Sequence, residues 1–118
     1  MDKADAHIHE LAKSKKLVIL NRRSRDRAIR ALTTIHQVVQ IFKPDQLSDV
    51  NFSEFFQDSV RNSPATFIED IDQVSSDTAD LIVQLSSRAE SPTTIWATAD
   101  RFDKVDPRVK QHFICEFC

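Results

Sequence analysis

The chain contains no glycine among its 118 residues. Glycine normally supplies the turns that need a positive φ, and it lets the backbone approach a ligand closely because it has no Cβ atom. Without it, neither G-x-G-x-x-G nor G-x-x-x-x-G-K-[ST] can be present, and these are loop patterns in which glycine-rich backbone cradles phosphates. The composition therefore excludes both kinds of phosphate-binding loop.

In other respects the sequence predicts a single globular domain that extends over residues 1–118. Apolar residues make up 41% of the chain and charged residues 29%, which is ordinary for a folded protein. No apolar run approaches the ~20 residues that span a membrane, the polar N-terminus does not resemble a signal peptide, and the two cysteines near the C-terminus make no disulfide framework. We therefore expect a cytoplasmic protein that has no membrane partner.

The charged residues are divided unevenly along the chain. Residues 1–43 carry ten Lys and Arg against four Asp and Glu, whereas residues 44–118 carry six against fourteen. A division of this kind is typical of an anion-binding face, or of two halves of a domain that attract each other.

Five short apolar runs alternate with segments of helical spacing. The runs occupy residues 16–20, 38–42, 65–68, 93–99 and 113–117, and the helical segments occupy residues 3–14, 28–35, 45–60, 76–89 and 105–111. Residues 38–42 could also extend the helix before them, but their β-branched side chains favour a strand. The alternation predicts the α/β class, as a single three-layer domain with a mostly parallel five-stranded sheet. We assign the following aromatic residues to its core: Phe42, Phe52, Phe55, Phe56 and Trp96.

Polar residues gather where three of the predicted strands end. They occupy residues 21–27, 69–72 and 100–101. In a parallel sheet the functional crevice lies outside the carboxyl ends of the strands. We therefore expect these three clusters to lie close together along one edge of the domain.

The three clusters resemble the nucleotide-contacting motifs of the AAA+ ATPases, most closely those of the replication initiator and clamp-loader branches. The likeness to the Walker B strand lies in residues 67–72 (FIEDID), and the likeness to the sensor 1 strand lies in residues 94–101 (TIWATADR). The segment that carries the arginine finger in the family is similar to residues 106–113 (DPRVKQHF). The resemblance covers about residues 60–117.

The resemblance implies a P-loop NTPase-like fold and gives particular residues a place in it. Asp70 and Asp72 correspond to the Walker B acids, and Asp100 corresponds to the sensor; we interpret all three as relics. His112 replaces the second arginine of the family, which is its usual finger. The helical lid domain of the family has no counterpart in these residues.

The first nucleotide motif of the family is the one from which this sequence departs most. Residues 21–28 (NRRSRDRA) stand in the eight positions of G-x-x-x-x-G-K-[ST]. Asn21 and Asp26 replace the two glycines, Arg27 replaces the lysine, and Ala28 replaces the hydroxyl that binds Mg²⁺. Because consecutive N–H groups can curl around a phosphate only where glycine allows it, we expect a degenerate core with no cofactor and no catalytic residue. It should bind neither ATP nor ADP.

Five arginines stand within nine residues at a predicted helix N-terminus: Arg22, Arg23, Arg25, Arg27 and Arg30. One hypothesis is that they bind the phosphates of a nucleic acid. The interpretation that we prefer is internal pairing with the acidic half, because cations oppose the helix dipole at this end and need an anionic neighbour. It predicts that Arg25 or Arg27 lies within ion-pair distance of Asp70 or Asp72.

Two groups of residues raise the question of a metal site. Glu69, Asp70 and Asp72 have the hard oxygen ligands of a magnesium-dependent enzyme, but no nucleophile or phosphate cradle accompanies them. The pattern H-x-x-C-x-x-C at His112, Cys115 and Cys118 could supply zinc ligands. A strand at residues 113–117 would turn Cys115 away from the other two. We therefore expect no metal at either place.

The function that follows is a non-catalytic binding or regulatory module that acts through protein–protein contacts. Its expected partner is a replication-type AAA+ ATPase or a second copy of itself. We place the contact on residues 101–112, with Arg101 and Arg108 as candidate contacts, because Arg108 and His112 correspond to the edge that meets the next subunit in the family. The alternatives are an accessory protein that binds nucleic acid through residues 22–30 and, with less support, a metal-dependent enzyme that uses the three acids.

Overall fold

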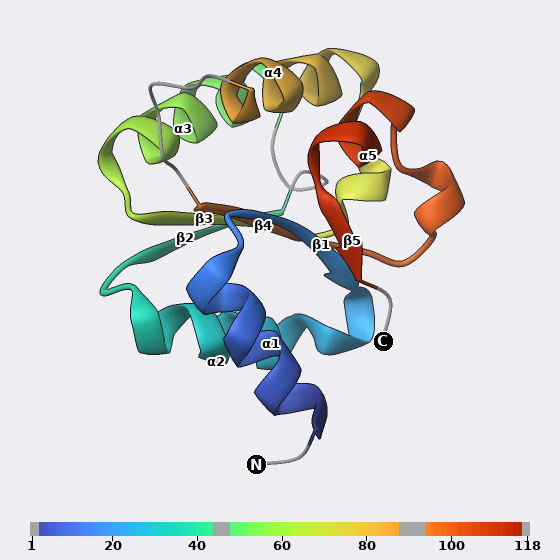
Figure 1. Ribbon diagram of the computed structural model, residues 1–118. Helices are drawn as coiled ribbons and strands as arrows, with labels where there is room; N and C mark the ends of the chain where they lie inside the picture. The colour runs from blue at the N-terminus through green and yellow to red at the C-terminus, as the bar shows by residue number, and fades with distance from the viewer. Residues whose placement is uncertain (1–2, 44–47, 88–93, 117–118) are drawn as a thin grey trace.

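The computed structural model describes residues 3–43, 48–87 and 94–116, and Figure 1 shows how its elements are layered. The strands are β1 (Leu17–Asn21), β2 (Val39–Phe42), β3 (Ala65–Ile68), β4 (Thr94–Ala99) and β5 (Ile114–Glu116). The helices are α1 (Lys3–Ser14), α2 (Arg25–Ile35), α3 (Asp49–Asn62), α4 (Ser76–Ser86) and α5 (Pro107–His112). Strands β1, β3 and β4 are each followed by a short 3₁₀ turn: η1 (Arg22–Ser24), η3 (Ile71–Gln73) and η4 (Phe102–Lys104).

The sheet has the strand order β2-β3-β4-β1-β5, and every pair of neighbouring strands is parallel. Helices α1 and α2 cover one face, and α3, α4 and α5 cover the other (Figure 1). The predicted α/β class and the three layers around a five-stranded sheet are confirmed, and a strand does form within residues 38–42. No helix in the described ranges is both long enough and apolar enough to cross a membrane.

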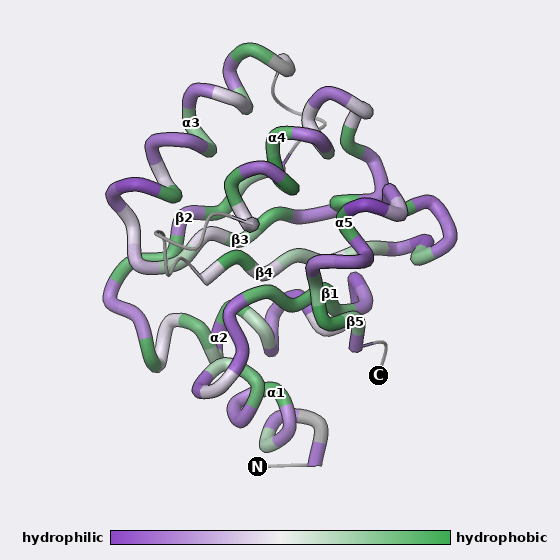
Figure 2. The backbone as a smooth tube through the Cα atoms, turned by 45° about the horizontal axis from the view of Figure 1, so that its top comes forward, coloured by the Kyte–Doolittle hydropathy of each residue, from purple (hydrophilic) through white to green (hydrophobic). Residues whose placement is uncertain are grey.

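The central strands are buried on both faces, as a parallel sheet between two helical layers requires. All four residues of β3 and all six of β4 are buried. Trp96 of β4 also donates a hydrogen bond from Nε1 to the carbonyl oxygen of Lys15, at 3.3 Å, which ties the end of α1 to the sheet. Figure 2 shows apolar residues concentrated along the strands, with hydrophilic residues on the outer turns of the helices.

An aromatic cluster joins α3 to the edge strand β2. The ring of Phe42 lies edge-on to those of Phe52 and Phe56, with centroids 5.8 and 6.3 Å apart, and the latter two rings stack at 5.3 Å. Phe55 is 50% exposed, so its assignment to the core is wrong. Phe55 lies about 100° around the helix from Phe56, at the margin of the arc that Phe52 and Phe56 bury against the sheet.

The helices end without left-handed residues at the positions where many proteins use glycine. The residues that cap the C-termini of α2, α3, α4 and α5 are His36, Ser63, Ser87 and Phe113, with φ between −113° and −89°. Helices commonly end with glycine at a positive φ, whereas three of these exits pass directly into extended backbone. Among the described residues the one positive φ, 56°, belongs to Asp70.

Candidate functional site

Strand β1 passes into helix α2 through the tight turn η1 rather than through an open loop. The side chain of Asn21 accepts a hydrogen bond from the N–H of Arg23 at 3.0 Å, and the N–H of Arg25 donates to the carbonyl oxygen of Arg22. Ser24 is buried in the same turn. Two N–H groups that would face a phosphate in a glycine-rich loop are therefore bonded within the turn itself.

Glu69 follows β3 and is the buried acid of the site, with 6% of its side chain exposed. Its Oε1 accepts a hydrogen bond from Nε of Arg25, and Nζ of Lys43 lies 3.9 Å from Oε2. The bond to Glu69, with a smaller contribution from Asp26 at 2.7 Å, raises the pKa of Arg25. Oε2 itself has no hydrogen-bond partner in the described part of the chain, so its charge is balanced by Lys43 without a hydrogen bond.

Asp70 turns the chain out of the sheet. Its backbone angles, φ 56° and ψ 55°, are left-handed, a conformation that aspartate tolerates better than most residues. Its N–H donates to Oγ1 of Thr98 at 3.4 Å, and its Oδ1 lies 3.6 Å from Nε of Arg22. This turn comes one residue after Glu69, so the two neighbouring acids contact different arginines.

Asp72 holds the turn that follows β4. Its two carboxylate oxygens accept hydrogen bonds from the backbone N–H groups of Asp100, at 3.4 Å, and Arg101, at 3.0 Å. The side chain therefore joins the ends of two neighbouring strands, and Asp100 itself is exposed. The contact found for Asp72 is thus a structural one.

The pairing of arginines with acids occurs, and one of its members is Glu69, an acid that the prediction did not name. Arg25 binds Glu69 and Arg22 contacts Asp70, whereas Arg27 lies 3.4 Å from Asp5 of α1. The reason is geometric: residues two apart on a helix point in nearly opposite directions, so α2 sends Arg25 toward the sheet edge and Arg27 toward α1. Two of the acids at the carboxyl ends of the strands are thus contacted by the protein's own arginines.

The three acids do not come together as a metal site. Glu69, Asp70 and Asp72 face Arg25, Arg22 and backbone N–H groups respectively. Throughout the described ranges, no group of three or more His, Cys, Asp or Glu is placed to hold a metal ion.

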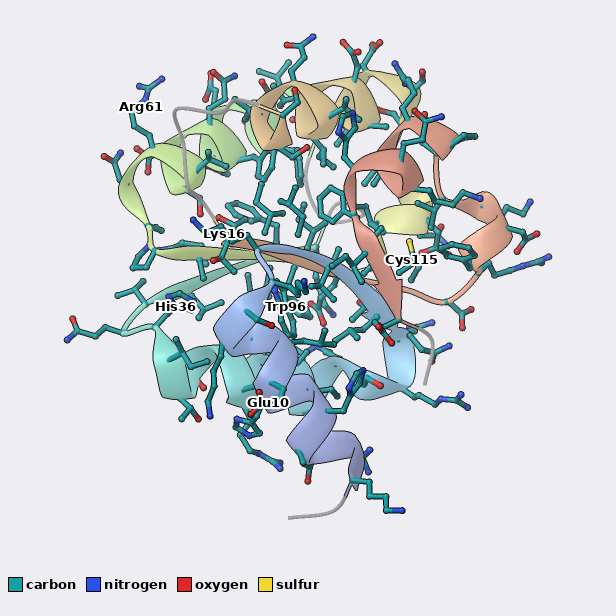
Figure 3. All side chains as sticks on the ribbon, in the orientation of Figure 1. Glu10, Lys16, His36, Arg61, Trp96 and Cys115 are labelled. Carbon is teal, nitrogen blue, oxygen red and sulfur yellow. The ribbon has the colours of Figure 1, made fainter. Side chains whose placement is uncertain are left out.

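The second candidate metal group is only partly described. Cys118 lies outside the described residues, and His112 is exposed. Cys115, in β5, is partly buried against the core (Figure 3), and this burial raises the pKa of its thiol.

Arg101 and Arg108, the two predicted partner contacts, differ in their surroundings. Arg101 is 61% exposed and lies 3.3 Å from Asp103. Arg108 contacts Asp106 at 3.0 Å and Asp80 of α4 at 3.1 Å, and it also donates to the carbonyl oxygen of Ser76. Arg108 therefore holds α5 against α4, which leaves Arg101 as the more accessible of the two.

Three residues of this network were not singled out from the sequence: Lys43, Asp80 and Thr98. Lys43 and Thr98 could have been found from the sequence by their position, because both lie at the carboxyl end of a predicted strand, as the predicted clusters do. Asp80 lies in the middle of α4, where nothing in the sequence distinguishes it from other exposed acids.

No protein-family model and no curated protein matches the sequence, but solved structures share its fold. A DNA polymerase III gamma subunit-related protein from Thermotoga maritima matches with a TM-score of 0.77 and 10% identity, over 97% of this chain and 45% of that one. The RuvB Holliday junction branch migration motor of the same organism matches with a TM-score of 0.71 and 14% identity, over 98% and 43%.

A third solved structure matches this chain over nearly the whole of its own length. The P-loop NTPase domain of the sigma-54 transport activator from E. coli has a TM-score of 0.67 and 10% identity, over 98% of this chain and 92% of that one. The present chain spans less than half of the first two structures. At these identities the comparison establishes the fold alone, which is that of the AAA+ P-loop NTPases.

Proposed function

We propose that this chain is a cytoplasmic, non-catalytic binding module with the AAA+ fold, which acts through protein–protein contacts. The observation that supports this most directly is the turn after β1. Its N–H groups are bonded to Asn21 and Arg22, and Arg25, the first residue of α2 after it, is paired with Glu69. A nucleotide would have to displace both sets of contacts and would also meet the charge of Glu69.

The expected partner is a replication-type AAA+ ATPase or a second copy of the chain. Two of the structurally similar proteins are a DNA polymerase III gamma subunit-related protein and a branch migration motor, which is the basis of the analogy. Residues 101–112 remain the contact that we propose, with Arg101 as its most exposed arginine. Arg108 contributes indirectly, because it fixes the position of α5.

The test is nucleotide binding by the purified chain. We expect no saturable heat in calorimetric titrations with ATP or ADP, with and without Mg²⁺, at millimolar nucleotide. We also expect no rise in melting temperature, since only a ligand that binds the folded state shifts it. RuvB of Thermotoga maritima, titrated in the same way, provides the control for the nucleotide stocks. Saturable binding of either nucleotide to this chain would refute the proposal.

A nucleic-acid-binding accessory protein is the second candidate. The observation in its favour is that Arg30 is exposed and forms no ion pair with the residues that the structure describes. Against it, Arg22, Arg25 and Arg27 have acidic neighbours within the chain. The salt dependence of binding to duplex DNA separates the two candidates.

A further inference from the structure

Strand β2 forms one edge of the sheet, and in the described ranges no other strand covers its outer side. The N–H of Glu69 donates to the carbonyl oxygen of Phe42 at 2.8 Å, so Phe42 directs its backbone groups toward β3. Backbone directions alternate along a strand, which means that Val39 and Ile41 direct their N–H and C=O groups outward. An edge of this kind is a template for one more strand.

Exposed apolar side chains flank this edge on both faces of the sheet. Ile35 at the end of α2, Val38 before β2 and Ile41 within it are 40%, 47% and 44% exposed, and Phe55 of α3 is 50% exposed. In Figure 1 the strand lies at the margin of the sheet, between these two helices. Natural edge strands usually carry charges or proline that prevent pairing, and residues 39–42 contain neither.

A groove of about 320 Å³ runs beside β2 on the α3 side. Its lining includes Phe42 and Phe55, with Asp58 and Ser59 of α3. The hydroxyl of Ser59 is engaged with that of Thr66 at 2.7 Å, so the groove has an apolar wall and one acidic group at its margin.

The charge beside the groove indicates what would occupy it. Glu54 and Asp58 lie one turn apart on α3 and are both exposed. Neither forms an ion pair with the residues that the structure describes; Asp58 accepts only a neutral hydrogen bond, from the amide of Asn62 at 2.8 Å. A lysine or arginine on the occupant would meet two unneutralised carboxylates.

We propose that β2 and this groove bind an extended segment of another protein, which adds to the sheet and carries apolar side chains with at least one lysine or arginine. Backbone bonds to Val39 and Ile41 would hold the segment, and Phe55 would cover one of its apolar side chains. A second copy of the chain fits less well. Antiparallel pairing of two β2 strands would set both α3 helices on one face, with the acids of the two copies close together.

This surface lies at the other end of the sheet from residues 101–112, and the proposal does not depend on nucleotide binding. The probe is a fluorescent heptapeptide, Ser-Val-Leu-Val-Lys-Val-Ser, titrated into ¹⁵N-labelled protein. We expect chemical-shift changes concentrated at Val39, Ile41 and Phe55. The matched peptide with glutamate in place of lysine should bind at least about tenfold more weakly.

Variants test the two components of the surface separately. Phe55→Ala should weaken peptide binding about tenfold, and Asp58→Lys should abolish the preference for the lysine peptide. The matched control is Ile114→Ala on β5, the opposite edge of the sheet, where the side chain is 38% exposed; it should bind the peptide as the unchanged protein does. All three side chains are exposed, so these variants should fold.

Four outcomes would overturn the proposal. They are absence of binding by the lysine peptide, shifts spread away from β2, equal affinity for the two peptides, and a dimer that buries β2 when the protein alone is sedimented at increasing concentration.

Discussion

At the scale of single residues, the backbone strain of the described chain lies at Asp70. A left-handed conformation costs an L-residue about 1–2 kcal/mol, and glycine adopts it without that cost. The strain has a structural result, because the turn at Asp70 separates Glu69, which binds Arg25, from Asp72, which holds the turn after β4.

Replacing Asp70 with glycine and with alanine tests this strain. Both variants lose the carboxylate near Arg22, so they differ mainly in the cost of the positive φ. We expect Asp70→Gly to be more stable than Asp70→Ala by about 1 kcal/mol in urea unfolding. The same pair of substitutions at Thr33, an exposed position of α2, should give the reverse order, because glycine weakens a helix. If alanine were the more stable at position 70, the left-handed turn would be wrong.

At the scale of elements, α5 shows how a very short helix is held in place. Six residues are too few for a helix to be stable alone in water. Asp106 caps its N-terminus by accepting from the N–H of Arg108 at 2.9 Å, and Pro107 stands at the first turn, where its missing N–H is no loss. The guanidinium of Arg108 then reaches Asp106 and Asp80. Hydrogen bonds from Arg108 lower the pKa of Asp106 below its ordinary 3.8.

The lowered pKa predicts how this contact responds to acid. A carboxyl group whose folded pKa lies below its unfolded value stabilises the fold fully above the unfolded value, and the contribution is lost as the pH falls through the folded pKa. An asparagine in place of Asp106 would keep the cap but lose the charge. We expect the stability difference between the unchanged protein and Asp106→Asn to be constant above about pH 5 and to shrink below about pH 4. Urea unfolding from pH 3 to 7 measures it, and a difference that does not vary with pH would contradict the ion pair.

The elements were largely predictable from the sequence, whereas the contacts between them were not. Alternating apolar runs and helical spacing are local patterns, and they gave the strands and most helix positions. The side chains that meet at the carboxyl edge depend on one backbone angle at Asp70. No glycine marks that angle in the sequence, so Glu69 was not expected as the partner of Arg25. Phe55 was misplaced for a different reason: Phe52, Phe55 and Phe56 span about 100° of the helix surface, and Phe55 stands at the margin of that arc, where it is exposed.

At the scale of the whole molecule, the uneven division of charge is partly balanced within the fold. Arg22 and Arg25 of the basic half contact Asp70 and Glu69 of the acidic half. Arg27 instead pairs inside its own half, with Asp5. Internal pairing of this kind leaves less positive charge for an external polyanion.

This balance predicts weak binding to nucleic acid. We expect the affinity for a mixed-sequence DNA duplex to vary little with salt. The slope of the logarithm of the binding constant against the logarithm of the salt concentration should correspond to fewer than about two phosphate contacts. The double variant Arg23→Glu, Arg30→Glu should change that affinity only slightly. Fluorescence anisotropy between 50 and 200 mM salt makes the measurement. A slope equivalent to four or five contacts, lost in the double variant, would favour the nucleic-acid-binding alternative instead.

The absence of glycine from the helix C-termini also affects the unfolded chain. A glycine at an exit leaves the denatured ensemble many more backbone conformations, and folding must remove them. At a position whose native angles suit it, a residue with a Cβ atom stabilises the protein by about 0.4–1 kcal/mol relative to glycine, chiefly by reducing that freedom. His36, Ser63, Ser87 and Phe113 all hold such angles. Part of the stability of this domain therefore arises from the smaller conformational entropy that its glycine-free chain loses on folding.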